Sequence, residues 1–137
     1  DDCIIDFGCG SPGKIDFLLR TDFLKIKDSI DVAFFSKENN YCFNISNEVF
    51  SFIDLWFNKK LKVNKNTSKE SASRECLYLI LDYIGYKCSN LLKINGLCNN
   101  GSLYNKIKLI YQCEKNIKKN LNLKHVFFNF YSGWISL

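Results

Sequence analysis

The stretch that decides the fold reads CLYLILDYIGYKC (residues 76–88) and is followed by CNNGSLYNKIKLIYQC (residues 98–113). The cysteines that open and close these two segments, Cys76, Cys88, Cys98 and Cys113, form a nested set. Folding the chain back near residue 94 brings Cys76 opposite Cys113 and Cys88 close to Cys98. The spacing therefore predicts a helical hairpin over residues 74–119 that two disulfide bonds staple together.

The residues around these cysteines support two helices. Residues 74–92 are apolar on almost every side of a helix, which is typical of a helix in the middle of a bundle. Gly96 and residues 99–101 indicate a turn, and Ser102 can cap a second helix that runs to about Lys119. Cys113 lies on the apolar face of that second helix, so it points toward the core, where a bridge to Cys76 is expected.

Outside the hairpin, the pattern predicts further helices and one long loop. Ser11 and Pro12 indicate the start of a helix over about residues 12–26. Residues 31–35 fit either a strand or the start of another helix. Residues 47–60 form a well-defined amphipathic helix, and the polar residues 62–73 are expected to be a loop. The apolar tail from His125 to Leu137 is expected to pack back onto the bundle as a strand or an irregular segment.

Length and composition favour one secreted domain covering residues 1–137. The chain is 47% hydrophobic and contains twelve Phe, enough for a packed core. Its seven cysteines, none in a C-x-x-C motif, suit an oxidising compartment. It begins at Asp1 and contains no Met, which suggests a mature product after signal removal, or a trimmed chain. We therefore expect a mainly α, disulfide-stabilised bundle of four or five helices.

The remaining cysteines leave the connectivity partly open. Cys42 is expected to join either Cys3 or Cys9, and this leaves one thiol over. That thiol either pairs between two chains, giving a dimer, or is buried. Three glycosylation sequons, at Asn44, Asn66 and Asn100, also fit a secretory pathway.

The basic charge is not a strong sign of a nucleic-acid partner. The formal net charge is +5, but seventeen of the nineteen basic residues are lysine and they are scattered along the chain. Nucleic-acid readers favour arginine, and the amino-acid bias resembles that of codons rich in A and T. We therefore expect a solvated basic surface.

No apolar run approaches the roughly 18 residues that a membrane span requires.

One short motif suggests an enzyme. Residues 4–10, IIDFGCG, resemble the first motif of class I methyltransferases, in which a strand ends in a Gly-rich turn beside S-adenosylmethionine. This resemblance implies that Asp6, Gly8 and Gly10 line a cofactor pocket. The chain is too short for the usual sheet of that family, however, and Pro12 stiffens the turn. Because the single histidine, His125, has no neighbouring catalytic or metal partner, we expect neither an enzyme nor a bound cofactor or metal.

A second resemblance covers residues 76–113. Tyr86-Lys87-Cys88 and Tyr111-Gln112-Cys113 each close a segment that an earlier cysteine opens. This order is similar to the paired cysteine-tyrosine-cysteine pattern of the bicycle family, which are secreted salivary effectors of gall-forming aphids. The resemblance implies a small helical insect protein delivered into host tissue, with Tyr86 and Tyr111 as scaffold residues packed beside the bridges.

Two non-enzymatic functions follow from these observations. The first is a secreted effector that binds a host protein or other macromolecule and alters host development or immunity. The second is a secreted carrier of a small hydrophobic ligand, because a helical bundle rich in Phe and Tyr can enclose an apolar cavity. The methyltransferase is the third hypothesis.

Overall fold

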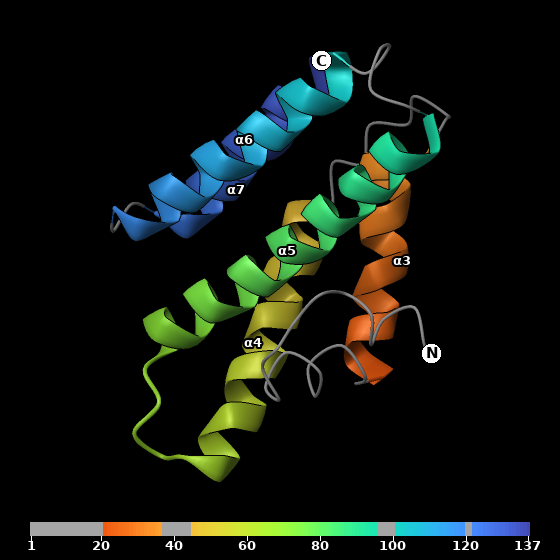
Figure 1. The fold of residues 1–137 in the computed structure, drawn as a ribbon. Coiled ribbons are helices and arrows are strands. Elements are labelled where there is room, and N and C mark those ends of the chain that lie inside the picture. Colours follow the sequence, from red (N-terminus) through yellow and green to blue (C-terminus); the bar gives the residue numbers. More distant parts are fainter. Residues whose placement is uncertain (1–20, 37–44, 96–100, 120–121) are drawn as a thin grey trace. The chain divides into compact units, whose positions relative to one another are not determined.

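The computed structural model describes residues 21–36, 45–95, 101–119 and 122–137. Within these ranges the chain forms helices and no strand. The helices are α3 (Thr21–Phe35), α4 (Ile45–Val63), α5 (Lys69–Asn95), α6 (Gly101–Lys118) and α7 (Leu123–Ile135), as Figure 1 shows. For the described residues, the predicted mainly helical fold with four or five helices is therefore confirmed. The disulfide stabilisation stays a prediction, because Cys76, Cys88 and Cys113 are free thiols in the structure.

The helices belong to two compact units, and the division between them falls within α5. The N-terminal unit (Asp1–Leu79) contains α3, α4 and the first part of α5. The C-terminal unit (Ile80–Leu137) contains the remainder of α5 together with α6 and α7.

In the N-terminal unit, α3 packs against α4 through apolar side chains. The rings of Phe23 and Phe52 meet edge to face, with their centroids 6.4 Å apart. On α3, Ile26 and Ile30 continue the stripe that Phe23 begins, at the spacing of one helical face, and both are buried. Each such side chain stabilises the fold by about 2 kcal/mol when it leaves water.

Two ion pairs connect α4 to the first turns of α5 inside this unit. Lys60 pairs with Glu75 and also lies 5.2 Å from the centroid of the Trp56 ring. The Nζ of Lys69 lies 3.2 Å from Oδ1 of Asp54. Because the second pair is exposed, we expect it to contribute less than about 1 kcal/mol.

The loop between α4 and α5 is shorter than the sequence pattern predicts. It covers residues 64–68, whereas residues 69–73 of the predicted loop belong to α5. The Oγ of Ser68 accepts a hydrogen bond from the backbone N–H of Ser71, which is a helix N-cap. In the next turn Arg74 pairs with Glu70, with 2.5 Å between Nη2 and Oε1. The polar residues 69–73 therefore belong to the first turns of α5. The sequence pattern did not indicate a helix there because these residues lack apolar periodicity.

Helix α3 also corrects the predicted boundaries at the start of the chain. The helix predicted over residues 12–26 overlaps the described residues only at 21–26, and these are helical. Residues 31–35, which fitted either a strand or a helix, form the end of the same helix. Ser11 and Pro12 lie outside the described residues.

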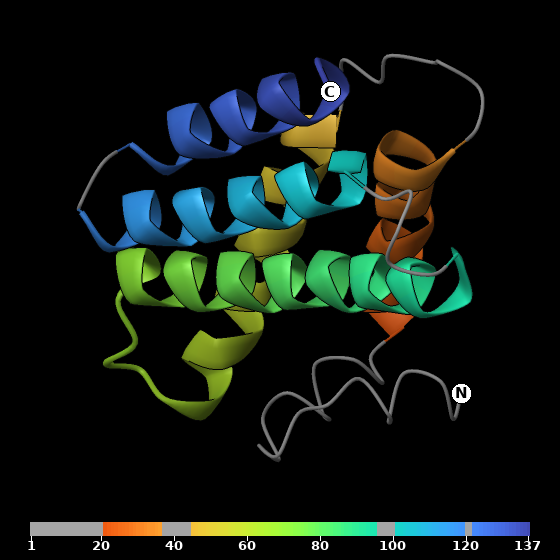
Figure 2. The ribbon, with the colours of Figure 1, turned by 45° about the horizontal axis from the view of Figure 1, so that its top comes forward.

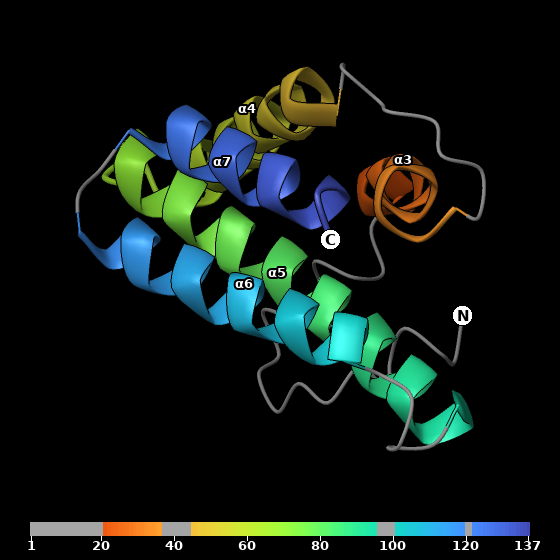
Figure 3. The ribbon, with the colours of Figure 1, turned by 90° about the horizontal axis from the view of Figure 1, so that it is seen from above.

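In the C-terminal unit, α6 lies alongside both of its neighbours. A Cβ added to Gly85 of α5 would lie 3.9 Å from Cδ1 of Ile110 of α6. A Cβ on Gly133 of α7 would lie 3.3 Å from Cδ2 of Leu109, so α6 and α7 approach closely. Figures 2 and 3 show the part of α5 that follows Ile80 running beside α6.

The prediction that the tail is a strand or irregular segment is wrong, because it forms helix α7. The prediction that the tail packs back onto the bundle is confirmed, since α7 contacts α6. Val126, Phe127, Phe130, Tyr131 and Trp134 are buried, and their spacing is that of one helical face. Aromatic residues favour strands in general, but here the periodicity decides the structure.

Candidate functional site

A groove of about 350 Å³ lies between α5 and α6 in the C-terminal unit and is open on one side. Helix α5 contributes Leu81, Asp82, Gly85 and Ser89 to it, and helix α6 contributes Ile107, Ile110, Tyr111 and Glu114. Its lining is about equally polar and apolar. We name it the α5–α6 groove.

Gly85 keeps the middle of this groove open. It is half-buried, and the nearest atom to a Cβ at this position would be Cδ1 of Ile110 at 3.9 Å. A methyl group therefore fits there in ordinary van der Waals contact, whereas a longer side chain would extend into the groove. Glycine in a helix interior costs about 1 kcal/mol of stability relative to alanine. Gly85 therefore leaves room in the groove at some cost to the stability of α5.

The two carboxylates of the groove lie at the same end of it. Asp82 precedes Gly85 by three residues on α5, and Glu114 follows Ile110 by four residues on α6, which runs in the opposite direction. Both residues are half-buried. Ser89 and Ile107 lie toward the other end, beyond Gly85 and Ile110. The groove thus has an acidic end at Asp82 and Glu114, an apolar middle at Ile110, and the hydroxyl group of Ser89 at its other end.

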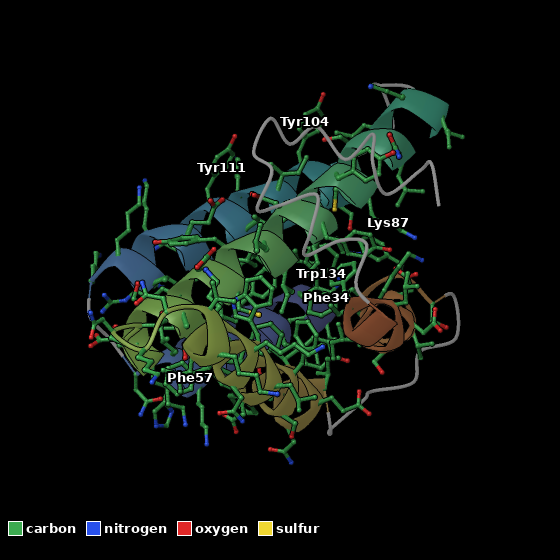
Figure 4. The ribbon with its side chains drawn as sticks, turned by 90° about the horizontal axis from the view of Figure 1, so that it is seen from below. Phe34, Phe57, Lys87, Tyr104, Tyr111 and Trp134 are labelled. Atoms are coloured by element: carbon green, nitrogen blue, oxygen red, sulfur yellow. The ribbon has the colours of Figure 1, made fainter. Side chains whose placement is uncertain are left out.

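Tyr111 forms part of the rim of the groove. Its side chain is 64% exposed, and Figure 4 shows it pointing outward on the same side of α6 as Tyr104, which is 43% exposed. The resemblance to the bicycle family implies that Tyr111 packs beside a disulfide bond, but in the structure Tyr111 lies at the surface. Tyr86, the other residue with this expected role, is half-buried on α5.

The register of the two helices differs from the one that the predicted disulfide pairing assumes. Gly85 is level with Ile110, and Cys88 lies close enough to Lys106 for that ammonium to lower the thiol pKa. The nested cysteines would instead place Gly85 opposite about Leu103 or Tyr104. In this register Cys113 is level with Asp82, and Cys88 is level with about Ile107.

The described cysteines are protonated thiols at neutral pH. Burial raises the pKa of Cys88 to about 11 and that of Cys113 to about 12, and it raises the pKa of Cys76 further still. Lys106 opposes this shift at Cys88, and Glu114 adds to it at Cys113. Because a thiolate is the reactive form, none of these three residues is suited to nucleophilic catalysis or metal binding as it stands.

Most of the other residues singled out from the sequence lie outside the described ranges. These are Cys3, Cys9, Cys42 and Cys98, the sequon residues Asn44 and Asn100, and the methyltransferase-like residues Asp6, Gly8 and Gly10. Asn66 is described: it is exposed in the loop between α4 and α5, where its backbone N–H donates to Oδ1 of Asn64. His125 is exposed in the first turn of α7, and its backbone N–H donates to Oδ1 of the N-cap residue Asn122.

Asp82, Gly85 and Glu114 were not identified from the sequence, although a signal was present. Asp82, Gly85 and Ser89 recur at intervals of three and four residues, so they form one column of small or polar residues on a helix that is otherwise apolar. A column of this kind marks either an exposed strip or a groove. Only the position of α6 distinguishes these alternatives.

Comparisons with known proteins identified no relative of this chain. No family model matches the chain, and neither the curated proteins nor the solved structures contain a match to it. Membership of the bicycle family therefore stays a prediction.

Within the described ranges, no three His, Cys, Asp or Glu side chains are grouped so that they could hold a metal ion. The helices described here also include none with the length and apolar character needed to cross a bilayer.

Proposed function

We propose that this protein is a non-enzymatic binding protein that docks a segment of a partner protein in the α5–α6 groove. The observation that carries the proposal is the opening at Gly85, where side chains of two helices converge around a space of about 350 Å³. Binding sites of proteins typically have volumes of roughly 300–1,000 Å³ and combine apolar walls with a few polar groups. The groove falls within this range of volumes, and its walls combine apolar with polar side chains in about equal parts.

The form of the groove favours a partner segment over a small hydrophobic ligand. A carrier encloses its ligand in an apolar cavity, whereas this groove is open on one side and carries two carboxylates. A peptide can place one side chain in such a groove and keep its backbone in water. The proposal therefore agrees with the first function expected from the sequence, a secreted effector that binds a host protein.

The methyltransferase hypothesis receives no support from the described residues. Its Gly-rich turn would follow a strand of a parallel sheet, and the ranges that the structure describes contain no strand. Its three motif residues lie outside those ranges.

A peptide-display selection tests the proposal. Peptides are selected on the full chain, and each binder is then measured against Gly85→Leu, which extends a side chain into the groove. The matched control is Gly101→Leu, because a Cβ at Gly101 has no atom within 4 Å and Gly101 does not line the groove. Circular dichroism establishes that both variants are folded.

We expect Gly85→Leu to weaken the selected peptides at least about tenfold, since a buried side chain of the peptide loses its site. The Gly101→Leu variant is expected to bind as the unchanged chain does. A selection that yields no peptide sensitive to Gly85→Leu, or peptides equally sensitive to both variants, would contradict the proposal.

A further inference from the structure

The loop between α4 and α5 carries the sequon Asn66-Thr67-Ser68, which the proposed function does not use. Figure 1 shows this loop joining the two helices. N-linked glycans are attached to asparagine in the pattern N-x-S/T, at positions on surface loops. Asn66 lies within the described residues, so the surroundings of this acceptor are defined.

The turn that contains Asn66 is held in place by Asn64 and Thr67. The backbone N–H of Thr67 donates to the carbonyl of Asn64 at 3.2 Å, which closes a β-turn of residues 64–67 with Asn66 in its third position. The Thr67 hydroxyl donates to the same carbonyl at 2.8 Å. The backbone N–H of Asn66 donates to Oδ1 of Asn64 at 3.0 Å. Hydrogen bonds inside the loop therefore fix the backbone at the acceptor.

The side chain of Asn66 is available for modification. The hydrogen bonds of the turn use the backbone of Asn66 and not its carboxamide, and the residue is exposed. Its neighbours Asn64 and Lys65 are exposed as well. A glycan on this carboxamide would thus displace no packed side chain and break none of the hydrogen bonds of the turn. Exposed loops are also where a fold tolerates added mass best.

Ser68, which completes the sequon, has a second role in the fold. Its Oγ accepts the backbone N–H of Ser71 at 3.0 Å and so caps α5. A hydroxyl that accepts one hydrogen bond still has its own proton to donate, so the cap does not exclude the role in the sequon. Thr and Asp also serve as N-caps, but only Ser or Thr completes a sequon. Substitution can therefore separate the two roles of Ser68.

From these observations we infer that Asn66 is an N-glycosylation site, which is occupied when the chain enters a secretory pathway. The site belongs to the N-terminal unit and the groove to the C-terminal unit, so the inference does not rest on the proposed function.

The modification is a transfer from an oligosaccharide linked to a lipid diphosphate, catalysed by an oligosaccharyltransferase. The carboxamide nitrogen of Asn66 forms a bond to the anomeric carbon of the oligosaccharide, and the bond from that carbon to the diphosphate oxygen breaks. The lipid diphosphate leaves with the bonding electron pair, and the nitrogen releases one proton.

The test expresses the full chain behind a cleavable signal peptide in a eukaryotic cell, and it combines secreted with retained protein. Cleavage after glutamate separates the sequons, because Glu48 and Glu70 bound a peptide of residues 49–70 that contains Asn66 and neither Asn44 nor Asn100. Enzymatic removal of the glycan in isotopically heavy water converts the modified asparagine to labelled aspartate. Mass spectrometry then locates and quantifies the label.

The variants alter the sequon and the turn separately. Asn66→Gln removes the acceptor and leaves the Ser68 cap in place. Ser68→Asp retains a cap but lacks the hydroxyl of the sequon, whereas Ser68→Thr retains both. The matched control is Asn64→Asp, which keeps an oxygen for the N–H of Asn66 and lies outside any sequon. Circular dichroism establishes that each variant is folded.

We expect label at residue 66 in most molecules of the unchanged chain, of Ser68→Thr and of Asn64→Asp. The label should be lost from Asn66→Gln and from Ser68→Asp. An unlabelled Asn66 in the unchanged chain would overturn the inference, whatever the Ser68→Thr variant shows. Label that persists in Ser68→Asp would also overturn it, because label without the sequon hydroxyl arises from spontaneous deamidation.

Discussion

At the scale of single residues, Gly85 and Gly133 differ in the space beside them. Space for a Cβ exists at Gly85, where the nearest atom would be 3.9 Å away. At Gly133 a Cβ would lie 3.3 Å and 3.4 Å from the two methyl groups of Leu109. The first glycine therefore leaves an open site, and the second permits close packing of two helices.

This difference gives a stability prediction. Replacing Gly85 with alanine should stabilise the protein by about 0.5–1 kcal/mol, because alanine restricts the unfolded chain and favours the helix. Replacing Gly133 with alanine should give a smaller gain or a loss, since the Leu109 side chain must shift. Urea unfolding of both variants measures this order, and a greater stabilisation at Gly133 would contradict the packing described here.

The buried thiols predict a loss of stability at alkaline pH in the reduced protein. A thiol whose pKa is raised in the folded state stabilises the fold fully below its unfolded pKa of about 9, and this contribution is lost as pH rises toward the folded pKa. For Cys88 and Cys113 the window therefore extends from about pH 9 to pH 11 and pH 12, respectively. Each thiol can contribute a slope of up to about 1.4 kcal/mol per pH unit.

Urea unfolding in the presence of a reductant, at neutral pH and within this window, checks the prediction. The Cys113→Ala variant should show a shallower decline with pH than the unchanged chain. The comparison cancels the titration of the many exposed lysines, which both proteins share. Identical pH profiles for the two proteins would show that Cys113 is not buried as a thiol.

At the scale of the helices, caps determine boundaries that apolar periodicity does not reveal. Asn122 caps α7, and its Oδ1 accepts the backbone N–H of His125 at 3.2 Å. Replacing Asn122 with alanine should cost about 1 kcal/mol in the free energy of unfolding. Asn129→Ala, the same change at an exposed position inside α7, should be neutral or slightly stabilising. Equal effects of the two changes in urea unfolding would contradict the assigned cap.

The sequence predicted those helices whose apolar residues recur regularly. The helix predicted over residues 47–60 and the one predicted from Ser102 to Lys119 lie within a few residues of α4 and α6. The start of α5 was missed because Ser68 and the Glu70–Arg74 pair favour a helix without any apolar pattern. The prediction of a strand or irregular segment for the tail is wrong because it did not take into account the helical spacing of Val126, Phe127, Phe130 and Trp134.

The groove could not be predicted because it depends on register. Cysteine spacing places Gly85 opposite about Leu103 or Tyr104, whereas in the structure Gly85 lies beside Ile110. An offset of this size changes which residues of α5 and α6 face one another, and thus brings Asp82 and Glu114 into the lining of the same groove. Register follows from side-chain packing between helices, which no local pattern in either helix specifies.

At the scale of the whole molecule, the state of the cysteines can be measured directly. The structure holds Cys76, Cys88 and Cys113 as thiols, while the sequence predicts Cys76–Cys113 and Cys88–Cys98 bridges. Alkylating the unreduced protein in strong denaturant, followed by peptide mass spectrometry, should label these three cysteines. Without denaturant they should react slowly, because they are buried. Recovery of a Cys76–Cys113 linked peptide would instead establish the nested pairing.

A nuclear Overhauser experiment on the full chain tests the register in which α5 and α6 pack to form the groove. We expect a cross-peak between the α protons of Gly85 and the δ1 methyl group of Ile110, whose carbon would lie 3.9 Å from a Cβ at Gly85. In the nested cysteine register Gly85 would instead face Leu103 or Tyr104. Cross-peaks from Gly85 to those residues, with none to Ile110, would contradict both the groove and the function proposed for it.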